Sequence, residues 1–75
     1  MAADQLLAAL RSMPFEAFVI RMTDGSSYRI PHPGYIAYPT EARTAAVVDE
    51  RGIVHILDLR LMTELIFENT LSLQV

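Results

Sequence analysis

Residues 15–30, FEAFVIRMTDGSSYRI, carry the pattern that most limits what this chain can fold into. Between residues 17 and 22 the side chains alternate, and Phe18 and Ile20 share one face in the two-residue period of a β-strand. The Asp24-Gly25 pair then marks a turn, and a second short run follows it. The stretch therefore predicts a β-hairpin with one apolar face. Because an isolated hairpin is marginal in water, other elements must cover that face.

The register of this hairpin depends on the length of its turn, because a slip of one residue sends every side chain to the opposite face. A two-residue loop would place Ile20 opposite Arg29. A three-residue loop, with Gly25 in a left-handed conformation as a G1 bulge, pairs Ile20 with Tyr28 instead. We expect the three-residue loop, because it gathers the apolar side chains on one face. These are Phe18, Ile20, Tyr28 and Ile30, with Phe18 opposite Ile30.

A short amphipathic helix is predicted ahead of the hairpin, over residues 3–13. Leu6, Leu10 and Met13 recur at helical spacing. Pro14 ends this helix, because a proline disfavours helical backbone in the residue before it. A helix of this length is weak alone, so we expect packing of its leucines on the hairpin to hold it in place.

Beyond the hairpin, irregular and strand-forming segments follow each other. Residues 31–43 contain three prolines and a glycine, which exclude a regular central strand. Strand character resumes over residues 43–49, and residues 49–52, DERG, are predicted to close a second hairpin. Residues 53–59 are apolar on both faces, which indicates a strand in the centre of a sheet, covered on both sides.

The end of the chain predicts one more strand and leaves the role of the tail open. Residues 60–63 form a tight connection to a fifth strand at about residues 64–67. Residues 71–75, LSLQV, alternate again. Three alternatives remain for this tail: it pairs with another chain as an exposed edge strand, it adds a sixth strand to the same barrel, or it frays.

Together these elements predict a mainly β fold in a single domain over residues 1–75. We expect a short N-terminal helix at about residues 3–13 and a small SH3-like or Sm-like barrel at about 15–68. Five or six antiparallel strands build this barrel, the sixth being the tail strand at about residues 70–75.

The chain is short for the apolar content that it carries. It has 75 residues, of which 52% are hydrophobic and only 20% charged. A domain of this size buries about 60% of the surface that its unfolded chain exposes. We therefore expect the excess apolar surface to lie at contacts between subunits of a homo-oligomer.

Charge and composition narrow the classes of function. The net charge is −3, and every basic residue is an arginine. This balance disfavours broad binding to nucleic acid, although arginines repeated on one face of an oligomer would still make a local positive patch. The absence of cysteine excludes disulfides and thiolate metal sites. No apolar run approaches the roughly 20 residues of a membrane span, and no leader-like segment precedes the fold, so a cytoplasmic location is expected.

The order of helix and strands resembles the Sm-like proteins of the Lsm and Hfq type. The likeness rests on the helix before the first strand, on residues 19–25, VIRMTDG, and on residues 56–65, ILDLRLMTEL, which resemble the second motif of that family. The chain also resembles a group of small bacterial proteins with a Pro-Phe-x-x-Phe, Asp-Gly and His-Pro pattern. Here that pattern is Pro14-Phe15, Phe18, Asp24-Gly25 and His32-Pro33, and it implies no activity.

The first resemblance implies a ring of six or seven subunits that binds single-stranded RNA. In that family the fourth strand of one subunit pairs with the fifth strand of its neighbour. Mapped onto this chain, residues 53–59 would meet residues 64–67 of the next copy. The implied interface residues are Ile53, His55, Leu57, Leu65 and Phe67.

The RNA-binding motifs of the family are matched only loosely. Its Asp-x-x-x-Asn pattern is replaced by residues 32–35, HPGY, and Arg60 alone corresponds to the basic part of its second motif. His32 and Tyr35 are candidates to stack on bases, and Arg60 is a candidate phosphate contact. The alternatives are that His32 is an ordinary loop side chain and that Tyr35 covers a small core.

No catalytic or metal-binding pattern accompanies these candidates. His55 is expected to be a hydrogen-bonded histidine in the core or at an interface rather than a metal ligand, since two histidines and no cysteine make a poor zinc site. Ser26 and Ser27 lack a nucleophile motif around them, and no glycine-rich phosphate loop is present. No cofactor and no enzymatic activity are expected.

The resulting hypothesis is a non-enzymatic, homo-oligomeric binding module with single-stranded RNA as its first ligand class. The alternative is an acidic module for protein–protein interaction or scaffolding that binds no nucleic acid. The low isoelectric point of about 5.1 and the missing lysines favour the alternative.

Overall fold

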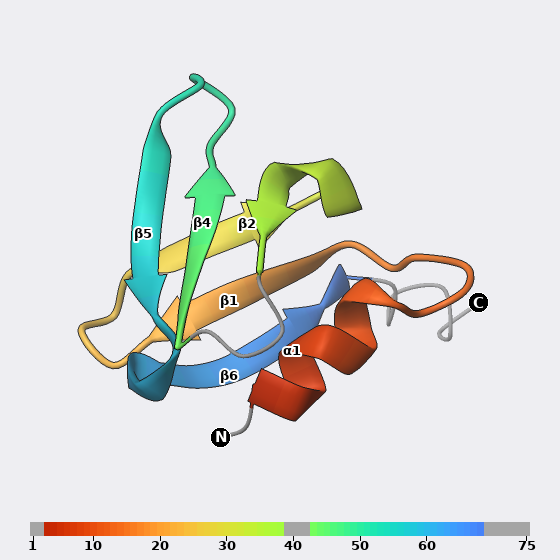
Figure 1. Ribbon diagram of the computed structural model, residues 1–75, viewed down its shortest axis with the longest axis horizontal. Helices are drawn as coiled ribbons and strands as arrows, with labels where there is room; N and C mark the ends of the chain where they lie inside the picture. Colours follow the sequence, from red (N-terminus) through yellow and green to blue (C-terminus); the bar gives the residue numbers. More distant parts are fainter. Residues whose placement is uncertain (1–2, 39–42, 69–75) are drawn as a thin grey trace.

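The computed structural model describes residues 3–38 and 43–68, and it is mainly β (Figure 1). Its two three-stranded antiparallel sheets have the strand orders β2-β1-β6 and β3-β4-β5. One helix and two short 3-10 turns complete the fold. In chain order the elements are α1 (Ala3–Leu10), β1 (Phe18–Met22), β2 (Ser27–Ile30), η1 (Pro33–Tyr35), β3 (Ile36–Ala37), β4 (Thr44–Val48), β5 (Val54–Asp58), η2 (Leu59–Leu61) and β6 (Met62–Phe67).

The predicted three-residue turn of the first hairpin is confirmed. Ile20 lies opposite Tyr28, and Phe18 lies opposite Ile30. The Gly25 N–H donates to the Met22 carbonyl at 3.0 Å, and Gly25 has a φ of +90°, the left-handed conformation of a G1 bulge. Glycine occupies this position because a β-carbon would make the left-handed conformation costly.

The second hairpin repeats the same turn chemistry. The Gly52 N–H donates to the Asp49 carbonyl at 2.9 Å, and Gly52 has a φ of +86°. The Asp49 N–H in turn donates to the Ile53 carbonyl at 2.9 Å. The prediction that residues 49–52 close a hairpin is thus confirmed.

A single core joins the two sheets and the helix. The sheet of β2, β1 and β6 forms the back layer in Figure 1, with α1 in front of β6 and the β4–β5 hairpin in front of β1 and β2. The side chains that fill the space between them are fully or nearly fully buried. They are Leu6, Ala9, Phe18, Ile20, Met22, Ile30, Ala45, Val47, Leu57, Leu59 and Met62.

The helix is shorter than predicted. It ends at Leu10 rather than near residue 13, and the Met13 side chain is 91% exposed instead of continuing the apolar stripe. The last turn is closed by an N–H of Ser12 that reaches the Ala9 carbonyl at 3.4 Å, and Pro14 disfavours helical backbone at Met13. Leu6 and Leu10 do pack against the core as expected.

The predicted central position of residues 53–59 is wrong. β5 is an edge strand, paired only with β4 among the described residues. Its inward side chain Leu57 is buried, whereas Val54 and Ile56 are exposed. The strand does not reach the centre because β6 turns away after η2 and pairs with β1 in the other sheet.

The strands do not form a closed barrel. In the described part of the chain no strand pairing links the sheet of β1, β2 and β6 to the sheet of β3, β4 and β5. The proline-rich segment after β2 contains η1 and the two-residue strand β3, so the described residues hold a strand where none was predicted. The predicted tail strand at residues 70–75 lies outside the described residues.

This packing predicts a large cost for shortening Leu6. Leu6→Ala should lower the free energy of unfolding by about 2–5 kcal/mol, because it removes a fully buried side chain beneath the hairpin and leaves a cavity. Leu7→Ala, next to it and only half-buried, should lower it by less than about 2 kcal/mol. Urea denaturation at one fixed protein concentration measures both, and equal losses would contradict this account of the core.

Candidate functional site

The three residues predicted to contact RNA are not brought together. His32 caps η1 and Tyr35 is its last residue, whereas Arg60 lies in η2, and Figure 1 shows these two turns at opposite ends of the molecule. His32 is exposed, and its Nδ1 accepts the Gly34 N–H at 3.0 Å, which caps η1. Tyr35 is half-buried and packs on the core. Arg60 and Tyr35 of one subunit therefore cannot contact the same nucleotide.

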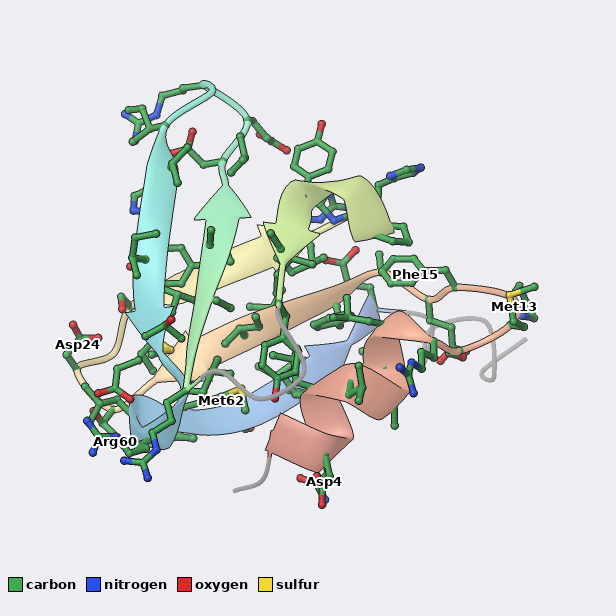
Figure 2. All side chains as sticks on the ribbon, viewed as in Figure 1. Asp4, Met13, Phe15, Asp24, Arg60 and Met62 are labelled. Atoms are coloured by element: carbon green, nitrogen blue, oxygen red, sulfur yellow. The ribbon has the colours of Figure 1, made fainter. Side chains whose placement is uncertain are left out.

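The guanidinium group of Arg60 is paired with the carboxylate of Asp58. Its Nη2 and Nε contact the Asp58 carboxylate at 2.8 and 3.1 Å, while Asp58 also accepts the Arg60 N–H and so caps η2 (Figure 2 labels Arg60). These hydrogen bonds, the guanidinium first, lower the pKa of Asp58 to about 2. The pair is charged at neutral pH and stabilises the turn between β5 and β6.

The predicted interface residues lie in different environments. Ile53 is exposed just before β5, and Leu57 points into the core. Leu65 and Phe67 are partly buried on β6, where they line a groove beside α1. The exposed neighbours Val54 and Ile56, which alternate with these residues on β5, were missed by the sequence analysis because that strand was expected to be covered twice.

A second cluster of polar residues lies where β2 faces the β4–β5 hairpin. It surrounds a hollow of about 440 Å³, which we call the inter-sheet cleft. One wall comes from consecutive residues of β2 and the other from the hairpin and its turn. The lining residues are Ser27, Tyr28, Arg29, Val47, Asp49, Glu50, Arg51 and His55.

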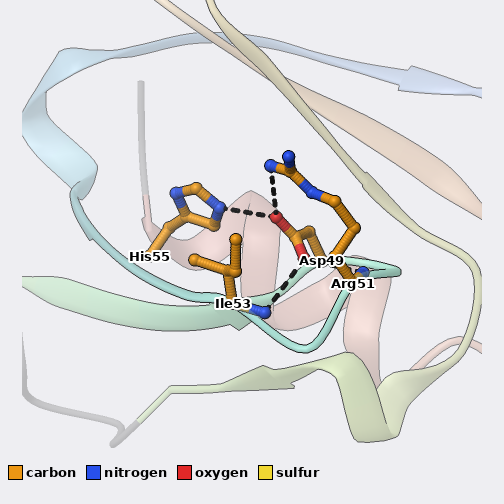
Figure 3. A network of polar contacts seen from close by, with 4 residues as sticks. All are labelled: Asp49, Arg51, Ile53 and His55. Carbon is orange, nitrogen blue, oxygen red and sulfur yellow. Dashed lines mark hydrogen bonds and ion pairs between the residues drawn. The ribbon is translucent and has the colours of Figure 1, made fainter.

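Asp49 is the centre of the hydrogen-bond network in this cleft (Figure 3). Its Oδ1 accepts the backbone N–H groups of Arg51 and Ile53 at 2.9 and 3.0 Å. Its Oδ2 contacts His55 Nε2 at 3.0 Å and Arg51 Nη2 at 3.3 Å. One carboxylate therefore closes the turn of the hairpin and also orients the imidazole of the next strand.

These contacts set the charge of Asp49 and the tautomer of His55. The hydrogen bond from His55, followed by that from the Ile53 backbone, holds the pKa of Asp49 far below its ordinary value. An ionised carboxylate can only accept, so Nε2 of His55 carries a proton and donates it. In the neutral imidazole, Nδ1 is then left as an acceptor. His55 is thus hydrogen-bonded as predicted.

The arginines of the cleft are only partly used. Arg29 donates through Nε and Nη2 to Glu68 at 2.8 and 3.0 Å, and its Nη1 stands 3.9 Å from Glu50. Arg51 has a 76% exposed side chain, and its Nη2 contacts the Asp49 carboxylate at 3.3 Å. The ring of Tyr28 stands against that of His55 with the centroids 5.1 Å apart. Cations and flat rings therefore share one surface.

The sequence alone gave little sign of this cleft. Asp49 and His55 both face inward from one hairpin, where Val47 pairs with His55, so strand register could have placed them together. Tyr28 and Arg29 belong to the other sheet, and only the tertiary packing brings them near.

The described residues offer no obvious metal or nucleophile site. Among residues 3–38 and 43–68, no group of three or more histidine, aspartate or glutamate side chains is placed to hold a metal ion. Ser26 donates its hydroxyl to Asp24 at 2.6 Å, and it belongs to the first turn rather than to the cleft.

Comparison with family models, with curated proteins and with solved structures gives no match to this chain. Within the described residues, the single helix is too short to cross a membrane.

The Asp49 network predicts how stability depends on pH. The folded pKa of Asp49 lies below the ordinary 3.8, so the unfolded chain takes up the proton first as the pH falls. The contribution of Asp49 is therefore complete above about pH 4 and is lost at lower pH. Asp49→Asn should lower the urea midpoint at pH 7, and its difference from the wild type should shrink as the pH falls towards 2.

Asp4→Asn provides the matched control, because Asp4 accepts no hydrogen bond in the described part of the chain. Its urea midpoint should follow that of the wild type much more closely. A constant difference between Asp49→Asn and the wild type from pH 7 to pH 2 would show that the ionised carboxylate is not what holds the turn.

Proposed function

We propose that this chain is a non-enzymatic module that assembles with copies of itself and binds its ligand on the assembled surface. The observation that carries the proposal is the exposed apolar side of the edge strand β5, where Val54 is 57% and Ile56 is 68% exposed. Free strand edges pair readily with other chains, and monomeric proteins usually protect them with charges, prolines or bulges. β5 has none of these before Asp58.

β6 supplies a matching edge on the other sheet. It is six residues long and pairs only with β1 in the described part of the chain. Beside it runs a groove of about 540 Å³ against α1, with Ala8, Ala9, Leu65 and Phe67 among its lining residues. A strand that adds to β6 from a second copy would use the backbone for pairing and alternate side chains for the groove.

The other two edges suit such pairing less well. β3 is only two residues long. β2 ends the first sheet with four residues, and Arg29 on it is tied to Glu68. Joining β5 of one copy to β6 of the next uses different surfaces, and such a contact closes into a ring when the rotation between copies allows it. A hexamer or heptamer is the expectation from the Sm-like resemblance.

Single-stranded RNA is the first ligand class that we propose for the assembled module. Its support is the Sm-like order of the elements, together with exposed Arg51 and Arg60 that a ring would repeat around its axis. A protein partner is the second class, and a specific observation favours it. Four of the six arginines are paired with carboxylates: Arg21 with Glu64, Arg29 with Glu68, Arg51 with Asp49 and Arg60 with Asp58.

The assembly is tested by one charge on the edge strand. The wild type should have a mass in solution that is a multiple of 8.4 kDa. Ile56→Lys should shift that mass towards the monomer, because a desolvated ammonium at the contact is unfavourable, whereas the exposed side chain is not needed for the core. Size-exclusion chromatography with light scattering measures both.

Met13→Lys is the control, since Met13 is equally apolar and 91% exposed but lies on the connection before β1. It should leave the mass unchanged. A wild-type protein that stays at 8.4 kDa at high concentration would refute the assembly.

RNA binding is tested with protein freed of nucleic acid. Labelled oligo(U) or oligo(A) should bind at low salt and weaken as salt rises, as measured by fluorescence anisotropy. Arg60→Gln should reduce the slope of log affinity against log salt by about 1 if this arginine contacts a phosphate, whereas Arg11→Gln, just after the helix, should not. Absence of binding at low salt, with polypeptides co-purifying, would favour the protein partner.

A further inference from the structure

We propose that the inter-sheet cleft binds a small organic anion that carries a flat ring, a chemistry shared by nucleoside monophosphates and aromatic carboxylates. The proposal goes beyond the assembly, because the cleft is built from the inner side of the β4–β5 hairpin and from β2. The proposed contact between copies uses the opposite, exposed side of β5 and the edge of β6.

The arginines of the cleft keep hydrogen-bond donors that no described residue uses. Arg51 donates through Nη2 to Asp49, and its Nε and Nη1 make no hydrogen bond to the described residues. Arg29 uses Nε and Nη2 for Glu68, and its Nη1 forms an ion pair with Glu50 at 3.9 Å, which is too long for a hydrogen bond. Guanidinium groups bind carboxylates and phosphates with paired, charge-assisted hydrogen bonds, so these free edges match an anionic ligand.

The carboxylate of Asp49, at the centre of the cleft, already accepts hydrogen bonds from its own hairpin. Asp49 accepts from Arg51 N, Ile53 N, Arg51 Nη2 and His55 Nε2, which together use both of its oxygens. Both carboxylate oxygens are thus turned towards donors of the hairpin, and the hydrogen-bonding groups left open to a ligand are donors of the guanidinium groups. Glu50 has a 79% exposed side chain in the turn between β4 and β5, where water can screen its charge.

Two aromatic rings form a flat surface beside these donors. Tyr28 and His55 come from different sheets, and their rings meet at 5.1 Å with a tilt of 53°. The hydroxyl of Tyr28 makes no hydrogen bond in the described part of the chain, and Nδ1 of His55 is an unused acceptor. A planar ligand can pack on these rings while its polar edge meets both groups.

The dimensions agree with a ligand of this size. The cleft measures about 440 Å³, within the roughly 300–1,000 Å³ that is usual for small-molecule sites. A metal ion fits the same residues poorly, because two guanidinium groups face the hollow and no third ligand joins Asp49 and His55 among the described side chains.

The histidines provide the readout, because the chain has only two. Titration with adenosine 5′-monophosphate, and separately with benzoate, should shift the ring proton resonances of His55 to saturation in NMR spectra. The resonances of His32, on η1 outside the cleft, should not move. Adenosine without phosphate and inorganic phosphate without a ring should each bind at least tenfold more weakly than the nucleotide.

Two arginine variants test the donors. Arg51→Gln should weaken binding tenfold or more, and its fold should survive because the side chain is exposed and its backbone N–H to Asp49 is kept. Arg11→Gln removes the same charge from the exposed end of α1 and should bind within twofold of the wild type. The unchanged His32 resonances and the urea midpoint confirm that both variants are folded.

The proposal is overturned if neither anion shifts His55, if His32 and His55 move together, if phosphate alone binds as well as the nucleotide, or if Arg51→Gln binds like Arg11→Gln. An oligo(A) that shifts His55 at lower concentration than the mononucleotide assigns the natural source to an RNA chain, and the reverse order assigns it to a free small molecule. A monomeric mass in light scattering removes the assembly and leaves this titration intact.

Discussion

Burial of the inner face of the β1–β2 hairpin is the interaction on which the rest of the structure depends. Phe18, Ile20 and Ile30 have no exposed surface, although the hairpin itself has nothing on that face to hide them. The helix covers this layer over β6, and the second sheet covers it over β1 and β2 (Figure 1). Leu6, Val47 and Leu57 are among the side chains that these two parts bury in the core. Each of the other elements is stabilised mainly by the apolar surface that it buries against this face.

This arrangement leaves the second sheet with one face in use. β4 and β5 turn Val47 and Leu57 inward, so the side chains that alternate with them, Val54 and Ile56, point to solvent. A chain of 75 residues has no further element within the described part to lay over them. The excess apolar content and the free edges are thus two consequences of one small core, and they lead to the proposed assembly.

Local carboxylates organise the polar part of the molecule. Asp24, Asp49 and Asp58 each accept the N–H of the residue two positions on, and hydrogen bonding to their neighbours lowers the pKa of each. Asp49 and Asp58 also form ion pairs with Arg51 and Arg60. In the inter-sheet cleft, the carboxylate partners of Arg29 and Arg51 leave some guanidinium N–H groups without a hydrogen bond among the described residues.

Much of the fold follows from the residues themselves. Alternation and turn chemistry determined both hairpins, including the G1 bulge at Gly25 and the pairing of Ile20 with Tyr28, because these depend on neighbours in sequence. Pro14 predicted that the helix ends before it, but it did not predict an end as early as Leu10. The polar candidates were chosen from loops by residue type, and nothing local reveals that η1 and η2 lie at opposite ends.

The sequence by itself determined the period of each strand, the left-handed turn glycines and the surplus of apolar side chains. Only the tertiary structure decided that β5 is an edge, that β6 crosses to pair with β1, and that Tyr28 meets His55 across two sheets. The physical reason is that an apolar strand has the same sequence pattern whether a sheet, a helix or another subunit packs on it. Which of these packs on it depends on contacts between residues that are distant in the chain.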